Sequence, residues 1–61
     1  MMQFLTVKKI STKEYIYINR PCELLGITND VITIKVGGRV EQFHTDFYYW
    51  FISNFWLEIG D

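Results

Sequence analysis

The sequence predicts an α+β domain in which two antiparallel β-hairpins form a curved sheet of about four strands, covered by one C-terminal α-helix. Three observations predict this class. A first and a second pair of β-rich runs are each joined by a short turn. The third observation is that the apolar residues near the C-terminus recur with helical periodicity. The chain has 61 residues, 49% of them hydrophobic, so we expect a single small domain over residues 1–61.

The first hairpin is predicted from "MQFLTVKKI" and "EYIYIN", two runs of aromatic and β-branched residues separated by the polar turn "STK". Because side chains alternate along a strand, Tyr15 and Tyr17 share one face, while Ile16 and Ile18 share the other. After Pro21, which cannot donate a ladder hydrogen bond, "CELLGITND" is predicted to be an irregular or briefly helical connection.

The second hairpin is predicted from "VITIKV" and "RVEQFH", which flank Gly37-Gly38. Apolar and polar residues alternate in the first of these runs, as expected for a half-buried strand. Two consecutive glycines supply the positive φ angles of a two-residue primed turn. This segment therefore has both the strands and the turn chemistry of a hairpin.

The segment from Thr45 to Gly60 is predicted to be the covering helix. As a strand it would be apolar on both faces, whereas helical spacing gathers its apolar residues in one stripe. Thr45 is a suitable N-cap, Asp46 favours the positive end of the helix dipole, and Gly60 can end the helix. The stripe expected to face the core consists of Tyr48, Phe51, Ile52, Phe55 and Ile59.

An alternative fold is an all-β, SH3-like small barrel in which residues 47–59 form another hairpin. Phe, Tyr, Trp and Ile all favour strands, and Ser53-Asn54 would supply the turn. The two alternatives differ in whether this segment covers the sheet or extends it.

On the helical wheel, Phe47, Trp50 and Leu57 lie away from the core stripe, together with the polar Asn54. Trp is enriched at the hot spots of protein interfaces. These four residues are therefore the candidate partner-binding face. Three explanations stay open: the rest of the chain buries this face, the face forms a homodimer, or it binds a different protein.

Composition excludes several classes of protein. The net charge of −1 is not that of a strongly basic nucleic-acid binder. Cys22 is the only cysteine, so no intramolecular disulfide is expected and a reducing, cytoplasmic location is predicted. The start "MMQFLTVKK" lacks the order of a secretory signal, and no run approaches the roughly 18 apolar residues of a membrane span.

Catalytic and cofactor motifs are absent from the sequence. Cys22 and His44 are too few to close a zinc site, and so short a chain leaves little room for the cleft that a nucleophile and base need. Gly37-Gly38 opens no helix and therefore does not indicate a phosphate loop. We expect a protein that is not an enzyme, with no metal, other cofactor or small-molecule substrate.

The leading functional hypothesis is a protein-interaction module, a small stand-alone inhibitor or adaptor that binds a larger protein, or its own copy, through the aromatic helix face. Small inhibitors carried by phages and other mobile elements, anti-CRISPR proteins included, fit this profile. The competing hypothesis is a small dimeric nucleic-acid-binding regulator or antitoxin. Basic residues beside sheet-borne aromatics favour single-strand binding. The candidates are Lys8, Lys9, Lys13, Tyr15, Tyr17 and Arg20.

The stretch "LGITNDVITIKVGGRV" contains Leu-Gly-Ile, an acidic turn, an alternating strand and a glycine-containing turn. In these features it resembles the swapped-hairpin family of dimeric transcription regulators and antitoxins, the AbrB/MazE type. The resemblance implies an intertwined homodimer with basic hairpin residues on DNA and a C-terminal segment that binds a toxin. The sequence departs from the family in "INRPCEL", where the expected proline is displaced, and in two spacings that are one residue short.

Overall fold

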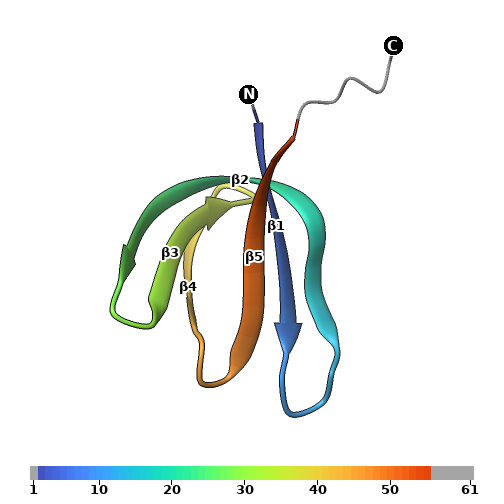
Figure 1. Cartoon of the computed structure of the whole chain (residues 1–61). Helices are drawn as coiled ribbons and strands as arrows, with labels where there is room; N and C mark the ends of the chain where they lie inside the picture. The colour runs from blue at the N-terminus through green and yellow to red at the C-terminus, as the bar shows by residue number, and fades with distance from the viewer. Residues whose placement is uncertain (1, 56–61) are drawn as a thin grey trace.

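The computed structural model describes residues 2–55, and this part of the chain is all-β, with no helix. It forms one five-stranded antiparallel sheet with the strand order β4-β3-β2-β1-β5 (Figure 1). The strands are β1 (Met2–Lys9), β2 (Tyr15–Thr28), β3 (Val31–Val36), β4 (Arg39–His44) and β5 (Tyr48–Phe55).

The predicted C-terminal helix is wrong, and with it the α+β class. Residues 48–55 instead form β5, which pairs with β1 from Met2↔Phe55 to Lys9↔Tyr48. Aromatic and β-branched side chains favour strands, and an unbroken ladder with β1 satisfies the backbone of β5 on one side. Tertiary pairing therefore overrides the helical periodicity.

The all-β alternative fits the structure, with one difference. Within the described part of the expected hairpin over residues 47–59, β5 is one continuous strand, and Ser53 and Asn54 lie inside it rather than in a turn. The predicted core stripe is also divided. Tyr48 and Ile52 pack against the core, whereas Phe51 is 42% exposed on the opposite face. Ile59 lies outside the described residues.

The predicted connection after Pro21 is also wrong, because β2 continues through this proline to Thr28. Pairing with β3 begins only at Cys22, so the missing N–H of Pro21 costs no ladder bond on that side. Just before it, Asn19 adopts a left-handed φ of 47°, and its N–H donates to Thr6 Oγ1 at 3.1 Å. The register of β2 against β1 shifts here, which marks a β-bulge.

Both predicted hairpins are confirmed. β1 pairs with β2, and β3 pairs with β4 across Gly37-Gly38, whose φ angles of 59° and 78° are positive as expected. No helix of the described residues is long and apolar enough to cross a membrane.

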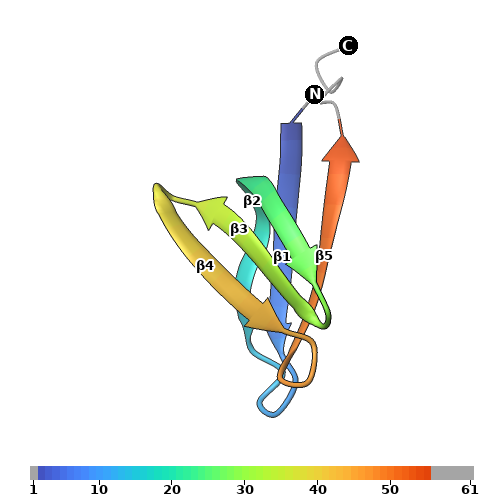
Figure 2. The same ribbon diagram turned by 90° about the vertical axis from the view of Figure 1, so that its left-hand side faces the viewer.

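The sheet curls around a small core because β2 is long and irregular and belongs to two parts of the sheet. Its first part pairs with β1 and its second part pairs with β3, and Figure 2 shows β3 and β4 crossing obliquely over β1 and β5. The inner face of the curled sheet holds the core, and Phe43 on β4 meets Tyr48 on β5 edge to face at 5.1 Å. The buried hydrophobic residues are Leu5, Val7, Ile32, Ile34, Val36 and Phe43.

We predict that truncating Ile34, which is fully buried in this core, destabilises the domain in proportion to the volume removed. Ile34→Val should lower the free energy of unfolding by about 0.5–1.5 kcal/mol and Ile34→Ala by about 2–5 kcal/mol. Val40→Ala on the neighbouring strand is the control, because Val40 is 61% exposed. Urea denaturation followed by circular dichroism measures these differences, and an equal loss for Ile34→Val and Val40→Ala would contradict this core.

Candidate protein-binding surface

The outer face of the sheet gathers aromatic side chains from three neighbouring strands. Lys8 on β1 pairs with Tyr15 on β2 and with Tyr49 on β5, and directly paired residues project to the same face. Phe51 follows Tyr49 by two positions and therefore shares that face. We call Tyr15, Lys8, Tyr49 and Phe51 the outer aromatic cluster.

The cluster is organised around the ammonium group of Lys8. Its Nζ lies 5.5 Å from the ring centroid of Tyr15 and 5.9 Å from that of Tyr49, both within cation–π range. The Tyr49 and Phe51 rings are 6.1 Å apart with their planes at 55°. Lys8 takes part in none of the salt bridges among residues 2–55. The Lys8 ammonium therefore contacts aromatic rings and is not neutralised by a carboxylate among these residues.

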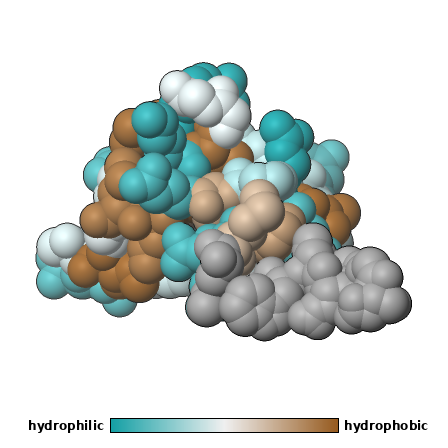
Figure 3. Space-filling model, turned by 90° about the horizontal axis from the view of Figure 1, so that it is seen from above, coloured by the Kyte–Doolittle hydropathy of each residue, from teal (hydrophilic) through white to brown (hydrophobic). Residues whose placement is uncertain are grey.

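The three rings of the cluster are accessible. Tyr15 is 53% exposed, Tyr49 52% and Phe51 42%, since no second layer of secondary structure covers this face within residues 2–55. Figure 3, which views the molecule from above, shows hydrophobic side chains reaching the surface between polar ones. Exposed apolar side chains are common singly, but a contiguous group marks a contact surface.

A second cluster lies on the inner side of β2 and β4, around Tyr17. Its hydroxyl donates to Glu41 Oε2 at 3.0 Å and accepts from Arg39 Nη2 at 3.1 Å, while Arg39 Nη2 also donates to Glu41 Oε2 at 2.8 Å. The guanidinium of Arg20 lies over the Tyr17 ring, with Cζ 5.6 Å from the centroid. The hydrogen bond to Tyr17 and the charge of Glu41 raise the pKa of Arg39. We call these four residues the Tyr17 cluster.

The residues nominated for nucleic-acid binding therefore do not form one row. Lys8 and Tyr15 belong to the outer aromatic cluster, whereas Tyr17 and Arg20 belong to the Tyr17 cluster on the other side of β2. The bulge in β2 separates them, because it breaks the simple alternation assumed from sequence. Lys9 and Lys13 lie at the end of the first hairpin, where the Lys13 N–H donates to the Lys9 carbonyl at 2.8 Å.

The residues nominated for a partner-binding helix face are also dispersed. Phe47 lies in the turn between β4 and β5 and is 63% exposed, with its ring 5.9 Å from that of His44. Trp50 is half-buried against the core, and its buried Nε1–H has no acceptor in the described part of the chain. Asn54 lies near the end of β5, and Leu57 lies outside the described residues.

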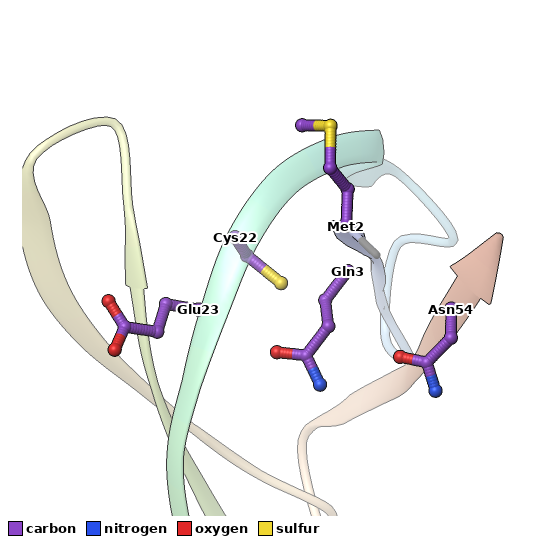
Figure 4. Close-up of a pocket in the computed structure, with 5 residues that line it drawn as sticks. All are labelled: Met2, Gln3, Cys22, Glu23 and Asn54. Carbon is purple, nitrogen blue, oxygen red and sulfur yellow. The ribbon is translucent and has the colours of Figure 1, made fainter. Parts of the chain in front are cut away.

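Asn54 borders a shallow hollow of about 370 Å³ between the start of β1, the middle of β2 and the end of β5, lined also by Met2, Gln3, Cys22 and Glu23. In Figure 4 the Cys22 thiol and the Asn54 amide point toward Gln3 from either side, whereas the Glu23 side chain points away from them. Gln3 Oε1 accepts the Leu24 N–H at 3.1 Å, so this amide bridges β1 to β2. The side-chain oxygen of Gln3 therefore has a structural role in the sheet.

Sequence reasoning missed Tyr49 and Phe51, two of the three exposed rings of the outer aromatic cluster. The helical assignment placed Phe51 in the core and gave Tyr49 no role. The available signal was the parity of residues 48–55, since in a strand Tyr49 and Phe51 must share a face that excludes Trp50 and Ile52.

Within residues 2–55, no three His, Cys, Asp or Glu side chains are grouped closely enough to hold a metal ion. Comparison with protein-family models, curated proteins and solved structures finds no match for this chain. The resemblance of "LGITNDVITIKVGGRV" to the swapped-hairpin family therefore gains no support from a family model. The chemistry of the two clusters is therefore the basis of the function proposed below.

We predict that the Cys22 thiol reacts slowly in the folded protein. Cys22 is half-buried, and desolvation raises the pKa of its thiol above its ordinary value, which lowers the fraction of reactive thiolate at any given pH. Alkylation by iodoacetamide at pH 8 should be slower in buffer than in urea, and its pH profile should move to higher pH. Mass spectrometry measures both rates, and equal rates in the two solvents would contradict the prediction.

Proposed function

We propose that this protein is a non-enzymatic interaction module, an inhibitor or adaptor that binds a larger protein through the outer aromatic cluster. The observation that carries the proposal is the grouping of Tyr15, Tyr49 and Phe51, each 42–53% exposed, around Lys8 on adjoining strands. Large aromatic side chains dominate the energetics of protein interfaces, and a lysine among them helps to fix how the partner is oriented.

The cluster is suited to binding because much of it is already ordered. Rings fixed on β-strands lose little conformational freedom on binding, and the two contacts of Lys8 with Tyr15 and Tyr49 restrain the longest side chain. A complementary partner surface would present apolar pockets for the rings and an acidic group near Lys8. A reducing, cytoplasmic location is proposed for this function on the single cysteine of the chain.

We predict that Tyr49→Ser combined with Phe51→Ser abolishes capture of the partner from extracts of the source cell. Removing two exposed interface rings should weaken binding by about 2–4 kcal/mol, enough to lose a micromolar complex in a pull-down. Capture is compared by quantitative mass spectrometry with that of the unaltered protein. Circular dichroism establishes that the variant is folded.

The matched control is Ile27→Ser combined with Val40→Ser. These residues are 55% and 61% exposed and lie outside the cluster, so the control removes a similar exposed apolar area. It should capture the partner as the unaltered protein does. Equal capture by both double variants, or equal loss, would show that the outer aromatic cluster is not the binding surface.

A second candidate function is single-stranded nucleic-acid binding on the same face. One observation favours it, the placement of the Lys8 ammonium between the exposed rings of Tyr15 and Tyr49. Stacking of bases on aromatic rings together with phosphate contacts to a cation is the usual basis of such binding. The negative net charge of the whole chain works against it.

For this second function we predict that Tyr15→Ala weakens binding of a labelled oligothymidylate by about 1–3 kcal/mol, the contribution of one stacked base. Lys8→Gln should weaken binding and reduce its dependence on salt concentration. Fluorescence anisotropy at several salt concentrations measures both effects, with Lys35→Gln as the control. Lack of binding by the unaltered protein at low salt would exclude this function and leave the protein partner unaffected.

A further inference from the structure

The Tyr17 cluster holds an excess of positive charge at the end of the sheet that carries the Gly37-Gly38 turn. Arg20 and Arg39 approach the same tyrosine, Arg20 over the ring and Arg39 at the hydroxyl. Glu41 is the one carboxylate of the Tyr17 cluster, and its Oε2 accepts from Arg39 Nη2 and from the Tyr17 hydroxyl. Two guanidinium groups and one carboxylate leave a net charge of +1.

Arg20 is held in place without being neutralised. Its Nη2 lies 3.9 Å from the position that a Cβ would occupy on Gly37, so the guanidinium extends from β2 to the turn between β3 and β4. It takes part in no salt bridge among residues 2–55. Its Cζ lies over the Tyr17 ring at 5.6 Å from the centroid, a cation–π contact that leaves the guanidinium donors without a carboxylate partner among residues 2–55.

The turn itself adds donors beside Arg20. Gly37 and Gly38 occupy the two central positions of a primed turn, and neither N–H donates to a backbone carbonyl in the described part of the chain. At 3.9 Å, Arg20 Nη2 is within ordinary van der Waals distance of a Cβ placed on Gly37, so the guanidinium and the turn lie side by side. Free N–H groups beside an arginine are the usual components of an oxyanion site.

We infer that Arg20, with Arg39 and the Gly37-Gly38 turn, binds the carboxylate of an acidic side chain on a partner protein, for which acetate is the small probe. A carboxylate carries one negative charge and would neutralise the excess of +1, and its planar geometry matches the guanidinium fork. A phosphate dianion would exceed that charge and place a second negative charge near Glu41. This site lies on the other side of β2 from the outer aromatic cluster and does not depend on the proposed function.

The test uses the full chain and two small probes, sodium acetate and inorganic phosphate, each titrated at constant ionic strength set with sodium chloride. Nuclear magnetic resonance follows the Gly37 and Gly38 amides and the Arg20 Nε–H. We expect acetate to shift these signals saturably. Arg20→Ala should weaken acetate binding about tenfold or more, since a hydrogen bond to a charged group contributes that much. Arg20→Lys keeps the positive charge but loses the planar guanidinium, so its affinity for acetate should lie between those of the unaltered protein and Arg20→Ala.

Two further variants separate a specific site from general charge effects. Glu41→Gln keeps an acceptor for Tyr17 and removes the competing negative charge, so acetate should bind more tightly. Lys35→Ala removes an exposed cation from β3 and should leave acetate binding unchanged.

Three results would overturn the inference. One is the absence of any saturable shift at Gly37, Gly38 and Arg20, and another is an equal loss of binding in Arg20→Ala and Lys35→Ala. The third is tighter binding of phosphate than of acetate at equal ionic strength, which would assign the site to a phosphoryl group instead.

Discussion

The pairing of β5 with β1 is the constraint on which the rest of this structure depends. It runs without a register shift from Met2↔Phe55 to Lys9↔Tyr48, whereas the pairing of β1 with β2 is interrupted by bulges. Because side chains alternate with a period of two, this register sends Trp50 and Ile52 to the core and Tyr49 and Phe51 to the outer face. A slip of one residue would exchange these two sets and expose the residues that complete the core.

The irregularity of β2 complements the regularity of β5. A straight 14-residue strand would leave β1 and β3 in one flat layer, and a flat layer of this size has no second surface to bury its apolar face. The bulge around Asn19 and the irregularity near Gly26 let one strand serve two differently oriented neighbours. The sheet thus covers its own core, and Phe43 and Tyr48 bring its two edge strands into contact.

The sequence was sufficient to predict the parts of the fold that depend on local chemistry. Gly37-Gly38 needs positive φ angles, and alternation in "VITIKV" needs one buried face, so the second hairpin followed from residues a few positions apart. The C-terminal segment was different because it is apolar at nearly every position, and its conformation is decided by a partner strand at the other end of the chain, from Lys9↔Tyr48 to Met2↔Phe55. The Tyr17 cluster could not be predicted from the sequence either. It brings Arg20 close to Arg39 and Glu41 because of a bulge that no local sequence pattern predicts.

The positions of the two clusters on opposite faces of the sheet explain why they differ in chemistry. On the outer face, Lys8 is surrounded by rings from both neighbouring strands, so its charge is flanked by apolar surface and the whole patch can be desolvated in a complex. Around Tyr17, the charged groups lie at the rim of the core, where hydrogen bonds among Tyr17, Arg39 and Glu41 fix them and leave Arg20 as the uncompensated cation. A surface of the first kind favours contact area, and one of the second kind favours a single anionic group. The fold therefore separates an apolar contact surface from a charged one by the thickness of a single sheet.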